Sequence, residues 1–323
     1  MCGLDNEMWA DALTSGGSGA QPKFVGKRVA GASRRLIGVE LEFSRFDVDD
    51  LREREALRHM TRWGAFGCYD GCVPRGMELV TSPASGTAFF EQAIEVIGPF
   101  QMAIVDDACG MHVHVDARDF SWYDVRRMII AYSRCESWLY SMCSPNRENN
   151  HFGGMNGGRW MSAVAKSRDP EESKRNIAYK LYGTADTRSR RNHKYEQARY
   201  GGFNLHSWLY RKTFEFRMHH GTKSIADVTN WAQIVAKMVD VAMESTEAEL
   251  LQGALALLRG RLTPSELEWS SDRRKFFRQL RHPDPARAAL DPDGALEQYR
   301  IARLASWPAH TSWVTLLTED NNQ

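Results

Sequence analysis

Residues 37–43 read IGVELEF, a short apolar run that contains two glutamates. Side chains two positions apart on a β-strand point to the same face, so Glu40 and Glu42 would project side by side while Leu41 and Phe43 face a core. Two neighbouring carboxylates repel each other, and burying them without partners costs free energy. The stretch therefore predicts either a strand with one solvated face or a site where arginine, lysine or metal cations compensate the pair.

The composition is that of an ordinary soluble globular protein, with 323 residues, 42% hydrophobic, 26% charged and a formal net charge of +1. The balanced charge predicts neither nucleic acid nor a membrane as partner. No apolar run reaches the length of a transmembrane helix, and the N-terminus lacks a signal-peptide pattern, so we expect a cytoplasmic protein. The six cysteines form no C-x-x-C pair and are expected to be free thiols.

The chain divides into three regions by composition and motif content. Residues 1–30 are rich in Gly and Ser and are expected to be a flexible lead-in. Residues 31–245 carry every motif that bears chemistry, and residues 246–323 are expected to form a helical extension packed on that domain. The expected strands are 37–43, 77–81, 110–116, 203–205 and 213–218, and the expected helices are 47–63, 86–97, 121–142 and 228–245. This order favours an α+β fold, with helices on one face of an antiparallel or mixed sheet.

The stretch 146–202 differs from its surroundings because it is rich in Asn, Gly and Arg and poor in long apolar runs. It is predicted to be loop-rich, and its basic patch at 189–194 would close over a nucleotide or an acidic substrate. His219 and His220 follow the strand at 213–218 and are expected at its rim.

Three of the expected strands place two polar side chains on one face, with apolar residues between them. The pairs are Glu40 and Glu42, His112 and His114, and Glu215 and Arg217. A fourth strand adds Glu78, and the turn before it adds Asp70. The repeated pattern predicts that a single face of the sheet is lined with these side chains.

If the faces converge, five carboxylates and at least one imidazole surround Arg217. Such an excess of negative charge requires bound cations. Oxygen ligands without cysteine favour Mg²⁺, and an imidazole ligand also suits Mn²⁺. Purely structural roles stay open as alternatives to metal or phosphate binding for single residues. These are an ordinary ion pair between Glu215 and Arg217, a turn-forming Asp70, and a core histidine at 112 or 114.

Several carboxylates around more than one divalent ion are typical of sites that hold a nucleoside triphosphate by its phosphates. The chain contains neither a G-x-x-x-x-G-K-[ST] sequence nor a Rossmann glycine fingerprint. ATP would therefore be bound on the sheet, where Arg217 stabilises the charge that spreads over a transferred phosphoryl group.

Taken together, the motifs resemble the amidoligase family of the carboxylate–amine/ammonia ligase superfamily, which includes glutamine synthetase and the glutamate–cysteine ligases. The resemblance rests on Glu-x-Glu at 40–42, Asp-Gly at 70–71 with a glutamate eight residues after the aspartate, Gly-x-His-Val-His-Val at 110–115, Asn-Leu at 204–205 and Thr-x-Glu-Phe-Arg-x-x-x-Gly-Thr at 213–222. It implies an antiparallel sheet curved into a half-barrel funnel that holds ATP and divalent metals. One departure is Cys72, where the family often has Ser.

Carried over motif by motif, the resemblance implies roles for individual residues. The implied metal ligands are Glu40, Glu42, Asp70, Glu78, Glu215 and one of His112 and His114. The expected catalytic residues are Arg217, Glu42 and Asp70, and Arg217 would contact the phosphates or the acyl phosphate. Arg147 and Asn204 match family positions and are expected, with Arg217 and the loop residue Arg199, to contact ATP. Solvated loop charges are the alternative for Arg147 and Arg199.

The expected function is ATP-dependent ligation of a carboxylate to an amine through an acyl phosphate. The partners would be a carboxylate-bearing amino acid, peptide or protein and an amine, and an oligomer is possible. Two alternatives stay open: a metal-dependent hydrolase (a phosphoesterase or amidohydrolase), which would act without ATP, and a non-catalytic nucleotide-binding or metal-binding relative. The ligase is favoured because a hydrolase does not need Glu-x-Arg on a further strand of the same face.

The two glutamates of the opening stretch carry a sharper expectation. Glu40 and Glu42 should be nearly buried, unpaired by protein cations and close to His112 or His114. Each should serve a divalent ion of its own.

Overall fold

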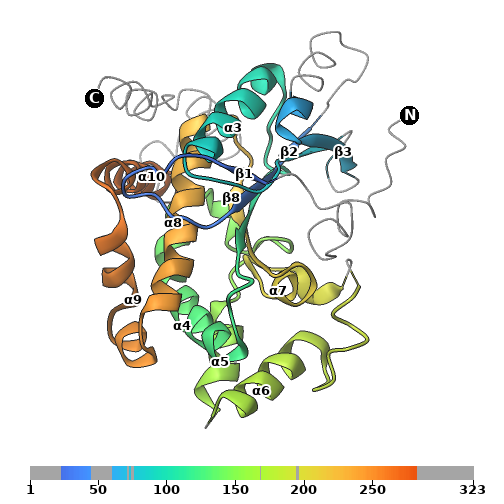
Figure 1. The fold of residues 1–323 in the computed structure, drawn as a ribbon, viewed down its shortest axis with the longest axis vertical. Helices are drawn as coiled ribbons and strands as arrows, with labels where there is room; N and C mark the ends of the chain where they lie inside the picture. The colour runs from blue at the N-terminus through green and yellow to red at the C-terminus, as the bar shows by residue number, and fades with distance from the viewer. Residues whose placement is uncertain are drawn as a thin grey trace, which may run out of the picture.

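A computed structural model describes residues 23–44, 60–70, 73, 76–167, 169–193 and 196–281. Within them the chain forms a mixed α/β fold with one mixed sheet and eight α-helices (Figure 1). The strands are β1 (Phe24–Val25), β2 (Ile37–Phe43), β3 (Phe66–Asp70), β4 (Gly76–Val80), β5 (Ala84–Ser85), β6 (Gly110–Asp116), β7 (Phe203–Asn204) and β8 (Thr213–His220). The helices are α3 (Thr87–Ile97), α4 (Trp122–Tyr140), α5 (Gly157–Ala165), α6 (Pro170–Tyr182), α7 (His206–Arg211), α8 (Ile225–Glu244), α9 (Glu247–Arg261) and α10 (Pro264–Arg281).

The opening stretch IGVELEF is β2, and it lies in the interior of the sheet. β2 pairs with β6 along one edge and with β4 and β5 along the other, and β8 and β7 continue the sheet beyond β6. All of these pairs are antiparallel, and the short pair of β1 with β5 is parallel. Among the described strands the sheet path runs from β1 to β7 without closing into a barrel. The expected antiparallel or mixed sheet is confirmed, whereas its curvature into a half-barrel stays a prediction.

One face of the sheet packs against helices and forms the core. α8 contacts β2 and β6, and α4 packs against α8, α9 and α5. Sixteen of the 20 residues of α8 are buried, so this helix lies between the sheet and the outer helices. Leu41 and Phe43 are fully buried on this side of β2, as period-two alternation predicts. Within the described residues no helix combines the length and apolarity needed to cross a membrane.

Local signals place the longest helices. α4 begins with a capping box in which the side chain of Ser121 and that of Asp124 each accept a hydrogen bond from the other's backbone N–H. The Ser224 hydroxyl caps α8 by accepting from the N–H of Asp227. The expected helices at 86–97, 121–142 and 228–245 are confirmed to within a few residues. The expected helix at 47–63 lies mostly outside the described residues, which resume at Met60.

The prediction of a loop-rich stretch at 146–202 is wrong in part, because α5 and α6 lie within it. α6 has ordinary helix signals: Asp169 caps it, Pro170 opens it, two glutamates occupy its first turn, and Gly183 ends it in the left-handed conformation at φ 70°. Only four residues of α6 are buried, so its sequence lacks the apolar periodicity that would predict a helix. The segments 148–156 and 183–193 are the irregular parts.

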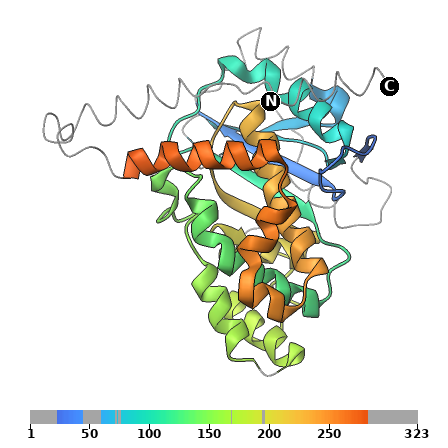
Figure 2. The same cartoon turned by 90° about the vertical axis from the view of Figure 1, so that its left-hand side faces the viewer.

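The described residues after α8 form the helices α9 and α10, and α10 is joined to α8 by two buried ion pairs. The ammonium group of Lys237 on α8 contacts the carboxylate of Glu266 on α10 at 2.5 Å, and the guanidinium of Arg273 contacts Asp227 at 2.9 Å. α10 runs across the helical layer at a steep angle to α9 (Figure 2). Residues 1–22 and 282–323 lie outside the described part of the chain.

The expectation that His219 and His220 lie at the rim is wrong, since their exposed fractions are 0% and 9%. The rings stack on each other, and His219 also packs against Trp231 of α8. A register shift between β6 and β8 is the cause, because Val113 pairs with Phe216 but Met111 pairs with His219. The extra β8 residue is a β-bulge, which bends and twists the strand locally.

Candidate metal and phosphate site

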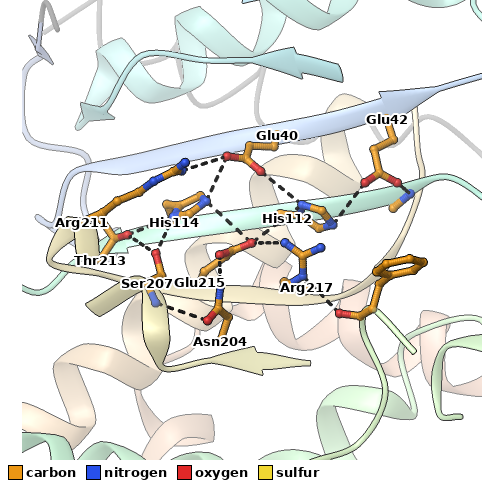
Figure 3. A network of polar contacts seen from close by, with 12 residues as sticks. Glu40, Glu42, His112, His114, Asn204, Ser207, Arg211, Thr213, Glu215 and Arg217 are labelled. Atoms are coloured by element: carbon orange, nitrogen blue, oxygen red, sulfur yellow. Dashed lines mark hydrogen bonds and ion pairs between the residues drawn. The ribbon is translucent and has the colours of Figure 1, made fainter. Parts of the chain in front are cut away.

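The register of the sheet brings the predicted polar residues onto one face. Glu40 lies directly opposite His112, and Glu42 lies opposite Glu78. On the next strand His114 lies opposite Glu215. Residues directly opposite in an antiparallel pair share a face and have neighbouring Cβ atoms. Figure 3 shows the resulting cluster, to which β2, β6 and β8 each contribute side chains.

Glu40 lies at the centre of this cluster. Its Oε2 is 3.2 Å from Nδ1 of His112, and its Oε1 is 3.1 Å from Nε2 of His114. Oε1 of Glu215 lies 3.9 Å from each of the same two ring nitrogens. The side chains of Glu40 and Glu42 are 14% and 12% exposed, so both glutamates are nearly buried and close to a histidine, as expected.

His114 is oriented by its neighbours in a way that suits a metal ligand. Its Nδ1 lies 2.9 Å from Oγ1 of Thr213, which in turn contacts the hydroxyl of Ser207 at 2.9 Å. Its buried Nε2 has no hydrogen-bond partner, because the nearby Glu40 oxygen is not aligned for one. An Nδ1–H that donates to Thr213 holds the ring so that Nε2, once it gives up its proton to a binding cation, offers its lone pair to that cation, which is the usual arrangement behind a metal-binding histidine.

Two groups of side chains have the geometry to hold a divalent ion. In each group the ligand atoms lie within 4.8 Å of one another. The groups are Glu40 with His114 and Glu215, and Glu40 with Glu78 and His112. Carboxylate oxygens and imidazole nitrogens suit Mg²⁺ or Mn²⁺. Glu40 belongs to both groups, so the geometry favours a carboxylate shared by two ions over the expected single ion for each glutamate.

Glu42 belongs to neither group in the described part of the chain. Its Oε2 accepts a hydrogen bond of 2.6 Å from the backbone N–H of Gly110, and its Oε1 lies 3.5 Å from Nε2 of His112. The predicted ligand Asp70 ends β3 and pairs with Gly76, while its side chain lies outside the described residues. Roles for these two carboxylates stay predictions.

Arg217 and Glu215 form an ion pair on the same face of β8, with Nη1 2.5 Å from Oε1. Burial alone would raise the pKa of Glu215, but the charge of Arg217 and of the two histidines lowers it to about 2. Arg217 is itself 5% exposed, and Nε donates to the carbonyl of Phe152 at 3.1 Å. Glu215 therefore stays ionised, and Arg217 is held at the site by a charge and by a backbone acceptor.

Two of the three other residues expected to contact ATP, Asn204 and Arg147, bond to Arg217 or to its partner Glu215. Asn204 donates from Nδ2 to Oε2 of Glu215 at 2.5 Å and accepts from the N–H of Ser207 through Oδ1, so it orients a metal ligand. Arg147 is 2% exposed and donates from Nη2 to the carbonyl of Arg217 at 2.8 Å. Arg199 stacks its guanidinium over the ring of Tyr200. Nucleotide contacts by these residues stay predictions.

Arg211 is a site residue that the sequence did not reveal. It ends α7 and lies with Nη1 3.5 Å from Oε1 of Glu40, so the expectation that Glu40 has no protein cation is wrong. Burial works to raise the pKa of Glu40, but the charges of His114 and Arg211 and the hydrogen bond from His112 hold it well below its ordinary value. The eight residues between β7 and β8 read as a connection, and only the folded α7 turns Arg211 toward Glu40.

Because Arg211 places a positive charge beside the carboxylate shared by both groups, we expect Arg211→Gln to bind Mn²⁺ more tightly than the wild type. Like charges about 5 Å apart in a partly buried site repel by a few kcal/mol, so the gain should be about tenfold or more. Calorimetric titration with Mn²⁺ alone measures it, and Arg211→Lys, which keeps the charge, serves as the control. Equal Mn²⁺ affinity in Arg211→Gln and the wild type would contradict the expectation.

Comparison with known families agrees with this geometry. A family model described as "Putative amidoligase enzyme" matches residues 45–239, more than half of the chain. The match defines the class as an enzyme of ligase type. The chain belongs to this amidoligase family, and the resemblance seen in its motifs is confirmed. A search of curated proteins gives no match to the chain.

Proposed function

We propose that the protein is an ATP-dependent ligase that joins a carboxylate to an amine through an acyl phosphate. The observation that carries the proposal is Glu40, which belongs to two candidate metal groups on the face that also presents Arg217. Two divalent ions beside an arginine are a common way to neutralise a transferred phosphoryl group. Membership of the amidoligase family supports the same reaction class.

The metal ions would be Mg²⁺ or Mn²⁺. The residues fit such ions because Nε2 of His114 is buried without a hydrogen-bond partner and is surrounded by carboxylates. The proposed ligands are Glu40, Glu78, His112, His114 and Glu215, with Glu42 and Asp70 as further candidates. Bound ions would screen the repulsion between the ATP phosphates and the attacking carboxylate.

The proposed reaction has two steps. A carboxylate oxygen of the acid substrate forms a bond to the γ-phosphorus of ATP as the bond from that phosphorus to the ADP oxygen breaks. The amine nitrogen then attacks the acyl carbon, phosphate leaves with the bonding electron pair, and the amine proton passes to solvent. The protein contributes position and charge, with Arg217 facing the phosphoryl oxygens, and no covalent enzyme intermediate is required.

By analogy with the superfamily, we propose that the sheet curves into a half-barrel of the glutamine synthetase type. ATP would lie on its open face, near Arg217, Asn204 and Arg199. The acid would be an amino acid, a peptide or a protein carboxylate, which approaches the shared metal ligand Glu40 together with an amine.

Release of ADP tests the proposal. Purified protein with Mg²⁺ and ATP should release ADP only when an acid and an amine of the right kind are both present. Arg217→Ala and Glu42→Ala should each slow release by about a hundredfold or more, because each removes a charge from the reacting face. Arg261→Ala, which removes one partner of an exposed ion pair with Glu244, is the matched control.

Two outcomes would contradict the assignment. ADP release by Arg217→Ala and Glu42→Ala at the wild-type rate would place the chemistry elsewhere. Cleavage of an amide or a phosphate ester without any nucleotide would instead support a metal-dependent hydrolase, the second candidate. A carboxylate shared between two metal groups also suits such an enzyme.

A further inference from the structure

A buried arginine donates to two backbone carbonyls of β8, next to the β-bulge of that strand against β6. Arg147 belongs to the 3₁₀ turn Pro145–Arg147. Its Nη2 donates to the carbonyl of Arg217 at 2.8 Å, and its Nε donates to that of Met218 at 3.4 Å. Buried backbone carbonyls need hydrogen-bond donors, so these two contacts stabilise β8 where its register against β6 shifts.

The chain packs closely against Arg147 at Gly153. A Cβ built on Gly153 would lie 2.4 Å from the carbonyl oxygen of Arg217 and 2.6 Å from Nη2 of Arg147. Only glycine permits this close approach of the chain. The neighbouring carbonyl of Phe152 accepts from Nε of Arg217. The segment 152–153 therefore packs on Arg147 and also holds the guanidinium of Arg217, which faces the candidate site.

α10 holds the 3₁₀ turn that carries Arg147. Arg281, the last described residue of α10, donates from Nη2 to the carbonyls of Tyr140 at 2.7 Å and Cys143 at 3.2 Å. Its Nε donates to Oε1 of Glu148 at 2.8 Å. These acceptors lie just before and just after the turn Pro145–Arg147, so Arg281 closes the turn from outside.

A second arginine of α10 reaches the end of β8. Nη2 of Arg273 lies 2.8 Å from Nε2 of His220 and 3.4 Å from Nε2 of His219, and Nη1 donates to Asp227 at 2.9 Å. Burial and the charge of Arg273 lower the pKa of His219 well below its ordinary value, so the histidines are neutral and tolerate the nearby arginine. Two arginines of α10 thus stabilise the region of the bulge. Arg273 contacts the end of β8, and Arg281 contacts the residues around the turn that carries Arg147.

We propose that Arg147 is a positioning residue for Arg217 and that α10 is part of the catalytic apparatus because it holds Arg147 in place. α10 lies beyond the family match, which ends at residue 239. This inference rests on the proposed function only in giving Arg217 a catalytic task. In this inference Arg147 acts through the strand that carries Arg217, and its contact with ATP stays a prediction.

The test follows the Nε–H of Arg217 by nitrogen-15 NMR, with no nucleotide or metal added. Loss of the signal in Arg217→Lys assigns it, and the Nε–H of Arg35, which donates to Asp240 at 2.8 Å, reports on the rest of the fold. We expect solvent exchange of the Arg217 signal to quicken about tenfold or more in Arg281→Ala and in Arg147→Met, with the Arg35 signal unchanged. Arg147→Lys should quicken it less, and Arg261→Ala should leave it unchanged.

Two results would overturn the inference. Unchanged exchange at Arg217 in both Arg281→Ala and Arg147→Met would show that neither residue positions it. Equal acceleration at Arg217 and Arg35 would show a general loosening of the fold and no specific positioning. Failure of the proposed function would be seen separately, as absent ADP release from a protein whose Arg217 signal responds as expected.

Discussion

Glu40→Gln should abolish tight Mn²⁺ binding at both groups at once, because Glu40 belongs to both. A neutral amide oxygen is a much weaker partner for a divalent ion than a carboxylate, and each group would lose its central charge. We expect two Mn²⁺ ions bound by the wild type and none by Glu40→Gln in calorimetric titration. Turnover should fall at least about a thousandfold, since metal-based charge stabilisation is worth several kcal/mol.

Glu78→Gln is the informative control, because Glu78 belongs to one group only. It should lose one ion and keep the site built by Glu40, His114 and Glu215. Thermal unfolding gives a second readout, since Mn²⁺ raises the melting temperature of any variant that binds it in the folded state. Two ions bound by Glu40→Gln, or equal losses in Glu40→Gln and Glu78→Gln, would refute the shared carboxylate.

Arg273→Met should lower the free energy of unfolding by about 3–5 kcal/mol, because it leaves Asp227 buried without its cation. The two side chains are 1% and 3% exposed, and the ion pair joins α10 to α8. Asp227 also accepts a hydrogen bond from the indole N–H of Trp269 at 3.0 Å. Removing the cation of Asp227 therefore also affects this contact between α8 and α10. Urea unfolding of purified variants measures the change.

Two further variants test whether burial of the ion pair is the reason for the large loss of stability in Arg273→Met. Arg261→Ala removes an arginine from an ion pair whose side chains are 56% and 51% exposed, and it should cost at most about 1 kcal/mol. Adding Asp227→Asn to Arg273→Met removes the unpaired charge and keeps an acceptor for Trp269, so it should recover part of the loss. An effect of Arg273→Met no larger than that of Arg261→Ala would contradict the expectation.

Much of the site could be predicted because its signals are local. Alternation along a strand fixes which side chains share a face, so Glu40 with Glu42 and His112 with His114 could be recognised from single segments. The apolar alternate positions also placed β2, β6 and β8 correctly. The helix α6 has no apolar periodicity to predict it, because few of its residues are apolar, although Asp169 and Pro170 mark its start.

Other features depend on contacts between segments far apart in the chain. Arg211 reaches Glu40 only because a short helix forms between β7 and β8. His219 and His220 are buried because a bulge in β8 shifts its register against β6. Neither the bulge nor the helices that cover it has a signature within the β8 sequence itself.

The sequence by itself determined the strands β2, β4, β6, β7 and β8, the identity of the polar residues on their common face and the family, because these follow from spacing within single segments. Only the tertiary structure decided that Glu40 is the residue common to both metal groups, that Arg211 is its protein cation, and that α10 reaches the strand of Arg217. The physical reason is strand register: moving a strand by one residue would turn every side chain to the opposite face, and register is set by packing across the whole sheet.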